Sequence, residues 1–151
     1  MPHETVSQNP VAPNFRLLLR ALAEEIDSLA APGERDDMLR GVGGRLARLL
    51  PVPAVGSLPA LEIEINDVLA GIGWGRTQLD LNEGERSLLI IHCGLPRIGS
   101  LGAPPGTWLA ALLEGLYSTW LAQQPGSMPG LAARLTSPGS ADAITLRFSR
   151  A

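Results

Sequence analysis

Residues 74–93 read WGRTQLDLNEGERSLLIIHC, and their alternation of apolar and polar residues predicts two β-strands. The first strand is expected over residues 74–81 and the second over residues 86–93, with residues 82–85 forming the turn of a hairpin. In the second strand four consecutive apolar residues, 88–91, occupy both faces. This pattern is typical of a strand in the interior of a sheet.

Three helices are predicted before this hairpin. Asn14 can cap the first helix, the second begins at Pro32 and ends before Pro51, and the third follows Pro59. The first helix has one apolar face, made by Phe15, Leu18, Leu19, Leu22, Ile26 and Leu29. These residues recur at helical spacing, so the segment is expected to be an amphipathic helix.

A long apolar helix and a second hairpin follow. Thr107 can cap a helix over residues 108–123 that is apolar almost all round, and such a helix is buried either beneath a sheet or between subunits. Strands are expected over residues 131–137 and 143–149, with Pro138 and Gly139 in the turn between them. The order predicts an α+β fold: three N-terminal helices, a β-hairpin, a long apolar helix and a closing β-hairpin, with a small antiparallel sheet.

The length of 151 residues fits one domain. Residues 1–13 are polar and contain three prolines, so we expect a disordered N-terminal tail followed by a single domain over residues 14–151. An apolar content of 45% is high for a domain that is only 18% charged. The excess apolar surface is expected to lie in subunit contacts.

The charged residues exclude several function classes. The chain has no lysine, which removes Schiff-base chemistry and the phosphate-binding lysine of P-loop enzymes. A net charge of −3 without a basic stripe argues against nucleic acid as a partner. No segment is apolar enough to span a bilayer or to serve as a secretion signal, so a cytoplasmic location is expected, and the lone Cys93 agrees with a reducing compartment.

Catalytic and cofactor sites are not expected. His92 and Cys93 are neighbours in a strand and point to opposite faces, and the only other histidine, His3, lies in the predicted tail. These are too few ligands for a zinc site of standard type. The glycine clusters at residues 41–44 and 71–75 lack nucleotide-binding spacing and follow helices rather than strands. The chain is therefore predicted to be a non-enzyme without cofactors.

Two groups of residues are candidates for an oligomer interface. Glycines in the second helix favour a kink or a close approach by another helix or subunit. Large residues of the long apolar helix favour the core or a subunit contact. The interface candidates are Gly41, Gly43, Gly44, Trp108, Leu112, Tyr117 and Trp120. Trp74 is a candidate for contact with a glucan chain, because a tryptophan ring can stack on a sugar.

Several motifs resemble one known family. Residues 106–110 (GTWLA), 113–117 (LEGLY) and 124–126 (QPG) are similar to a signature of the bacterial cellulose synthase operon protein D family. Residues 15–27 (FRLLLRALAEEID) and 95–99 (LPRIG) resemble the same family in the same order, and the resemblance extends from about residue 14 to the C-terminus. Cys93 and Gly94 depart from an acidic pair expected of the family, and Ala111 stands where proline is common.

The resemblance implies a non-catalytic accessory subunit that assembles as a homo-octamer, a tetramer of dimers. Such an assembly would act as a scaffold that arranges cellulose synthase complexes, so that their products crystallise into ribbons. The implied partners are a second copy of the chain, a proline-rich scaffold protein of the cellulose operon and the inner-membrane synthase. The alternative is a cylinder whose inner passages bind and guide nascent glucan chains.

Two further functions stay open at this point. A cytoplasmic protein would not meet glucan that emerges across the inner membrane, which favours the scaffold over a carbohydrate-binding module. The order of elements also resembles vesicle-tethering and 4-vinyl-reductase-like domains. A small apolar-ligand sensor of that kind would need a closed, lipid-sized cavity between helix and sheet.

Overall fold

The computed structural model describes residues 15–29, 31–95, 107–137 and 143–150. The predicted N-terminal tail and the predicted turn at Pro138 and Gly139 lie outside the described residues. Within the described ranges, no helix is long and apolar enough to cross a membrane.

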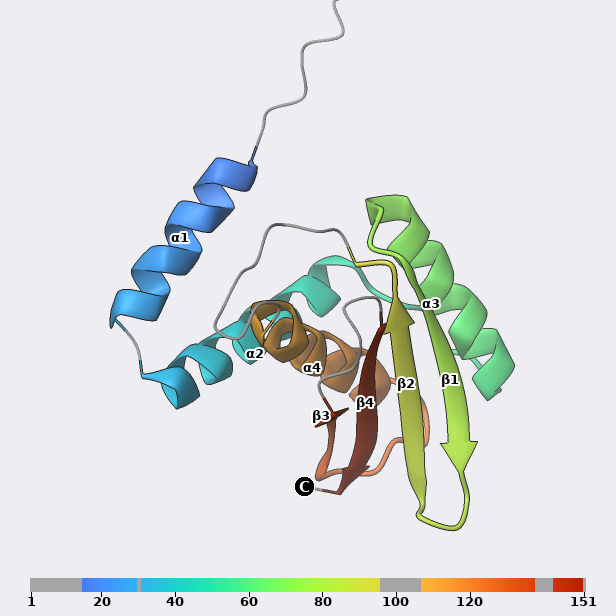
Figure 1. The fold of residues 1–151 in the computed structure, drawn as a ribbon. Coiled ribbons are helices and arrows are strands. Elements are labelled where there is room, and N and C mark those ends of the chain that lie inside the picture. Colours follow the sequence, from blue (N-terminus) through green and yellow to red (C-terminus); the bar gives the residue numbers. More distant parts are fainter. Residues whose placement is uncertain (1–14, 30, 96–106, 138–142, 151) are drawn as a thin grey trace, which may run out of the picture.

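Four helices and four strands make up the described chain, and they confirm the predicted α+β fold (Figure 1). In chain order they are α1 (Arg16–Leu29), α2 (Pro32–Leu49), α3 (Leu58–Ile72), β1 (Arg76–Asn82), β2 (Ser87–Cys93), α4 (Thr107–Ala122), β3 (Leu131–Ser137) and β4 (Ala143–Arg150).

The strands form one antiparallel sheet in the order β1-β2-β4-β3. Leu79 of β1 pairs with Ile90 of β2, which pairs in turn with Leu146 of β4. β2 therefore lies inside the sheet, as its apolar run predicts. All three of these side chains are buried and belong to the hydrophobic core.

Helix α4 packs beneath the sheet, α3 lies along β1, and α2 packs on α4 (Figure 1). The apolar helix was predicted to be buried either beneath a sheet or between subunits. Within the chain, it is the sheet that buries it. Leu113, Leu116, Tyr117 and Trp120 of α4 are all completely buried. Helix α1 projects away from this body (Figure 1).

Both strands of the first hairpin begin later than predicted. Strand β1 begins at Arg76 rather than at residue 74, because Gly75 has a φ of +82° and a side chain there would collide with the carbonyl oxygen of Cys93. Strand β2 begins at Ser87 because Arg86, with a φ of +50°, still belongs to the turn.

Candidate interaction surface

The glycines of α2 have two different environments. A Cβ atom on Gly43 would collide with the carbonyl oxygen of Leu112 and lie 2.7 Å from the amide nitrogen of Leu116, so this glycine lets α2 and α4 touch through their backbones. Gly44 of α2 lies next to the side chain of Thr119 of α4. Gly41 is exposed, with no atom within 4 Å of its Cβ position. Gly43 and Gly44 thus form a helix contact within the chain, and of the three only Gly41 faces outward.

Two of the aromatic interface candidates of α4 lie in the core of the chain. Tyr117 and Trp120 are completely buried and make an edge-to-face contact, with 5.7 Å between their ring centroids. The indole nitrogen of Trp120 donates a hydrogen bond of 2.9 Å to the carbonyl oxygen of Leu50. Leu112 is partly buried, and the side chain of Trp108 lies outside the described residues. A role of these residues in subunit contacts stays a prediction, and their described contacts are internal.

His92 is also buried, and both of its ring nitrogens have a partner. Nε2 lies 2.8 Å from the carbonyl oxygen of Trp74, and Nδ1 lies 2.6 Å from the hydroxyl of Tyr117. Because a carbonyl oxygen only accepts, Nε2 must hold the ring proton and Nδ1 must accept from Tyr117. Burial lowers the pKa of His92 and raises the pKa of Tyr117, so both side chains are neutral at pH 7.

The remaining chemical candidates are separated from this pair. Cys93 lies on the opposite face of β2 from His92 and pairs across the hairpin with Arg76. Trp74 is partly buried against the hydrophobic core, so only part of its ring surface is open for stacking on a sugar. No group of three potential metal ligands occurs among the residues that the structure describes.

Side chains of α3 cover the outer edge of β1. The amide of Asn66 bonds to both backbone groups of Thr77, accepting from its N–H at 2.7 Å and donating to its carbonyl at 3.0 Å. The carboxylate of Glu62 accepts from the N–H of Leu79 at 2.8 Å. Because each N–H has one proton, the N–H groups of Thr77 and Leu79 are not available to another strand.

Side chains of α4 cover the opposite edge of the sheet in the same way. The hydroxyl of Ser118 accepts from the N–H of Ala133 at 2.8 Å, and the carboxylate of Glu114 accepts from the N–H of Leu135 at 2.8 Å. The other oxygen of Glu114 pairs with Arg40 of α2 at 2.9 Å. Extension of the sheet by a partner strand is blocked at these positions, which leaves the helix faces and the open face of the sheet as the candidate contact surfaces.

These covering residues were not identified from the sequence, although a signal for them exists. From residue 108 to its end, helix α4 is apolar except for Glu114, Gly115, Ser118 and Thr119, and each of the four lies at a contact that needs it. Glu114 and Ser118 cover β3, Gly115 admits the backbone of Arg40, and Thr119 contacts Gly44. Polar residues that interrupt an otherwise apolar helix thus mark its neighbours.

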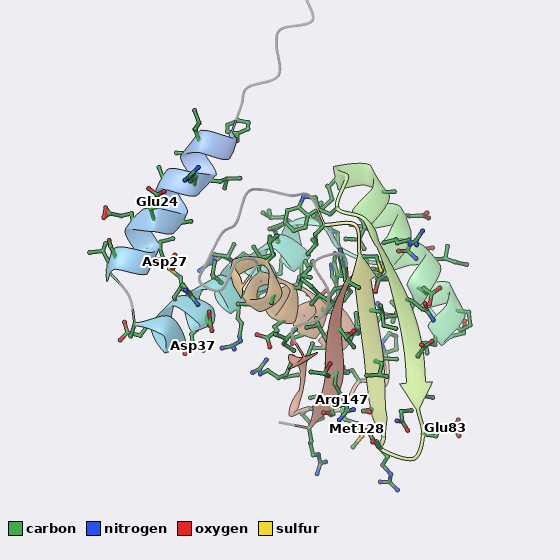
Figure 2. The ribbon with its side chains drawn as sticks, viewed as in Figure 1. Glu24, Asp27, Asp37, Glu83, Met128 and Arg147 are labelled. Carbon is green, nitrogen blue, oxygen red and sulfur yellow. The ribbon has the colours of Figure 1, made fainter. Side chains whose placement is uncertain are left out.

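Helix α1 has the most exposed apolar face of the described chain. Phe15, Leu18, Leu22 and Leu29, which we call the α1 stripe, are 60%, 55%, 47% and 78% exposed. Among the described helices and strands α1 approaches only α2. Asp27, labelled near the end of α1 in Figure 2, pairs with Arg35 of α2 at 3.1 Å. A 14-residue helix is marginal by itself in water. An apolar face left open on such a helix indicates a surface for a partner.

The sequence is similar to known proteins along most of its length. A family model for the D subunit of cellulose synthase matches residues 1–149. Cellulose synthase operon protein D of Komagataeibacter xylinus is 46% identical over 115 residues, which cover 76% of this chain and 74% of the relative. The protein of the same name from Komagataeibacter sucrofermentans has the same identity over the same length.

Proposed function

We propose, from the fact that this chain belongs to the cellulose synthase operon protein D family, that it is a non-catalytic accessory subunit of the bacterial cellulose synthase system. Its role is that of a homo-oligomeric scaffold, which arranges synthase complexes so that their glucan products crystallise as ordered ribbons. A closed assembly repeats one partner-binding surface several times, so weak contacts add by multivalency and impose regular spacing.

The observation that supports this role is the α1 stripe. Its four exposed fractions amount to about two fully exposed large side chains per copy. Burying the stripes of two copies against each other would contribute roughly 6 to 12 kcal/mol before the entropy of association is subtracted. The four stripe residues are apolar, and the exposed Glu25 falls on the same face by helical spacing, between Leu22 and Leu29, so two packed stripes would be apolar around this carboxylate. The occupant of the stripe is therefore a second copy of this chain.

The family supplies the remaining parts of the proposal. The assembly is a homo-octamer, built as a tetramer of dimers, which works in the cytoplasm next to the inner-membrane synthase. Its further partner is a proline-rich scaffold protein of the same operon. Because the described backbone edges of the sheet are occupied by side chains, such a partner binds to helix faces or to the sheet's open face rather than by adding a strand.

Guidance of nascent glucan at Trp74 is the second proposal that the family suggests. It differs from the scaffold role in one measurable respect, because a conduit must bind sugar. Titration of the assembled protein with short β-glucans, followed by tryptophan fluorescence, separates the two roles. Binding that perturbs Trp74 supports the conduit, and no binding at millimolar oligosaccharide supports the scaffold alone.

The scaffold role is tested in a cellulose-producing bacterium that lacks its own operon protein D. The chain, supplied from a plasmid, is expected to restore aligned ribbons, whereas Leu18→Glu/Leu22→Glu is expected to restore only disordered cellulose. Leu17→Glu is the matched control, because Leu17 is 72% exposed but lies outside the stripe. Equal ribbon order with the stripe variant and with the control would contradict the proposal.

A further inference from the structure

We infer that copies of this chain also join through a second contact, in which the outer face of α2 packs antiparallel against the outer face of α3 of the next copy. The inference rests on the proposed homo-oligomer and names a surface of it that is distinct from the α1 stripe. Its basis is a match of charge, size and spacing between two exposed faces that do not meet within one chain.

The outer face of α2 is basic and apolar. Arg45 and Arg48 are exposed and have no hydrogen-bond or ion-pair partner in the described part of the chain. Leu49, next to them, is 79% exposed, which is the largest exposure among the described large apolar residues outside α1. Val42, one turn before Arg45, is also exposed, and the neighbouring Gly41 has open space around its Cβ position.

The outer face of α3 is acidic and apolar. The helix has three carboxylates and no basic residue. Glu62 accepts a hydrogen bond from β1, whereas Glu64 and Asp67 have no partner among the described residues. Ile63 is 61% exposed and ranks second to Leu49 among the described large apolar residues outside α1.

The two faces match when the helices run antiparallel. On α2 the arginines are three residues apart and are followed by the exposed leucine. On α3 the order is reversed, with an exposed isoleucine followed by two acids three residues apart. One register then sets three pairs opposite each other: Arg45 with Asp67, Arg48 with Glu64, and Leu49 with Ile63.

The same register continues into the next turn with small residues. Val42 falls opposite Ala70, and Gly41 falls opposite Gly71. Neither glycine has an atom within 4 Å of its Cβ position, so both leave room for a neighbouring helix to approach. Charge, bulk and space thus agree over about two and a half turns of each helix.

The contact must form between copies. No Cα atom of α2 lies within 8 Å of one in α3 in the same chain. A contact between two different surfaces of identical subunits is heterologous and closes into a ring when the rotation allows it. The α1 stripe, which pairs with itself, then joins copies by a separate, isologous contact.

Charge reversal tests this contact. Arg45→Glu/Arg48→Glu and Glu64→Arg/Asp67→Arg are each expected to weaken assembly about tenfold or more, because each variant sets like charges opposite each other. An equimolar mixture of the two variants, and a single chain with all four changes, are expected to recover the size of the wild-type assembly. Assembly mass is measured by light scattering at matched protein concentration.

The controls are reversals at exposed charges elsewhere, Arg134→Glu/Arg150→Glu and Asp80→Arg/Glu83→Arg, which should leave the mass unchanged. Higher salt should weaken the wild-type contact, because exposed ion pairs are screened. If the wild-type protein assembles but the two reversed variants assemble equally well, or if neither their mixture nor the fourfold variant recovers the mass, the α2–α3 contact is wrong. A wild-type protein that remains a single copy contradicts the proposed scaffold itself.

Discussion

The hydroxyl oxygen of Tyr117 lies 2.6 Å from Nδ1 of His92, and both side chains are buried between α4 and β2. The arrangement uses the neutral form of histidine, because Nδ1 must accept the tyrosine proton while Nε2 donates to the carbonyl of Trp74. Protonation of His92 would turn Nδ1 into a second donor and break the bond from Tyr117. The pair therefore makes the core sensitive to pH.

The first prediction concerns stability against pH. Burial lowers the pKa of His92 in the folded state, whereas in the unfolded chain it stays near 6.5. Below that pH the unfolded chain binds a proton that the folded chain does not, so the free energy of unfolding decreases. Between about pH 7.5 and about 5.5 this loss should reach about 1 kcal/mol.

Urea unfolding monitored by tryptophan fluorescence measures this loss. His92→Gln should reduce overall stability and remove the histidine part of the pH dependence, while His3→Gln should retain it. An unchanged pH dependence in His92→Gln would show that another group causes the loss.

The second prediction separates the glycines of α2 and α4. Gly43→Ala and Gly115→Ala should each destabilise the fold by about 2 kcal/mol or more, because the new Cβ meets backbone atoms of the facing helix. Within a single copy, Gly41→Ala should be neutral or stabilising by up to about 1 kcal/mol, because its surroundings in the chain are open and alanine favours the helix. Thermal unfolding compares the three variants, and equal melting temperatures would rule out the close α2–α4 crossing.

The third prediction concerns the carboxylate that joins three elements. Glu114→Ala leaves Arg40 without one of its ion pairs and the N–H of Leu135 without an acceptor, so it should cost about 3 kcal/mol. Glu114→Gln keeps an oxygen for Leu135 and should cost less. Chemical denaturation measures both variants, and a loss below about 0.5 kcal/mol for alanine would contradict the geometry.

The fourth prediction concerns the edge of β1. Asn66→Ala frees two backbone groups of Thr77, so it should lower stability by about 1 to 3 kcal/mol and make the protein prone to sheet-based aggregation. Asp80→Ala, an exposed change on the same strand, should do neither. The comparison uses unfolding curves together with thioflavin binding after prolonged incubation, and identical behaviour of the two variants would count against an edge protected by α3.

The order and type of all eight elements were predictable from the sequence, because each is specified by a local pattern. The apolar run at residues 88–91 predicted a central strand, and β2 is central. The boundaries at Arg76 and Ser87 were missed by one or two residues, because positive φ angles at Gly75 and Arg86 depend on how the hairpin closes. Such angles are not visible in hydrophobic periodicity.

The surface was less predictable than the fold. Tyr117 and Trp120 were candidates for a subunit contact, but an apolar residue looks the same in a sequence whether its own chain or a second copy buries it. In contrast, the apolar face of the first helix was visible from its spacing, and only the structure showed that the chain leaves it open. The roles of Asn66 and Glu114 depend on strands distant in sequence, and no local pattern specifies them.

The mass of the protein in solution, measured by light scattering before and after Leu18→Glu/Leu22→Glu, tests the central claim most directly. The wild-type protein is expected to be an oligomer, the stripe variant to lose mass markedly, and the matched variant Leu17→Glu to lose none. Leu17→Glu adds the same kind of charge on the same helix outside the stripe. A wild-type protein that is monomeric, or a stripe variant that keeps the wild-type mass, would contradict it.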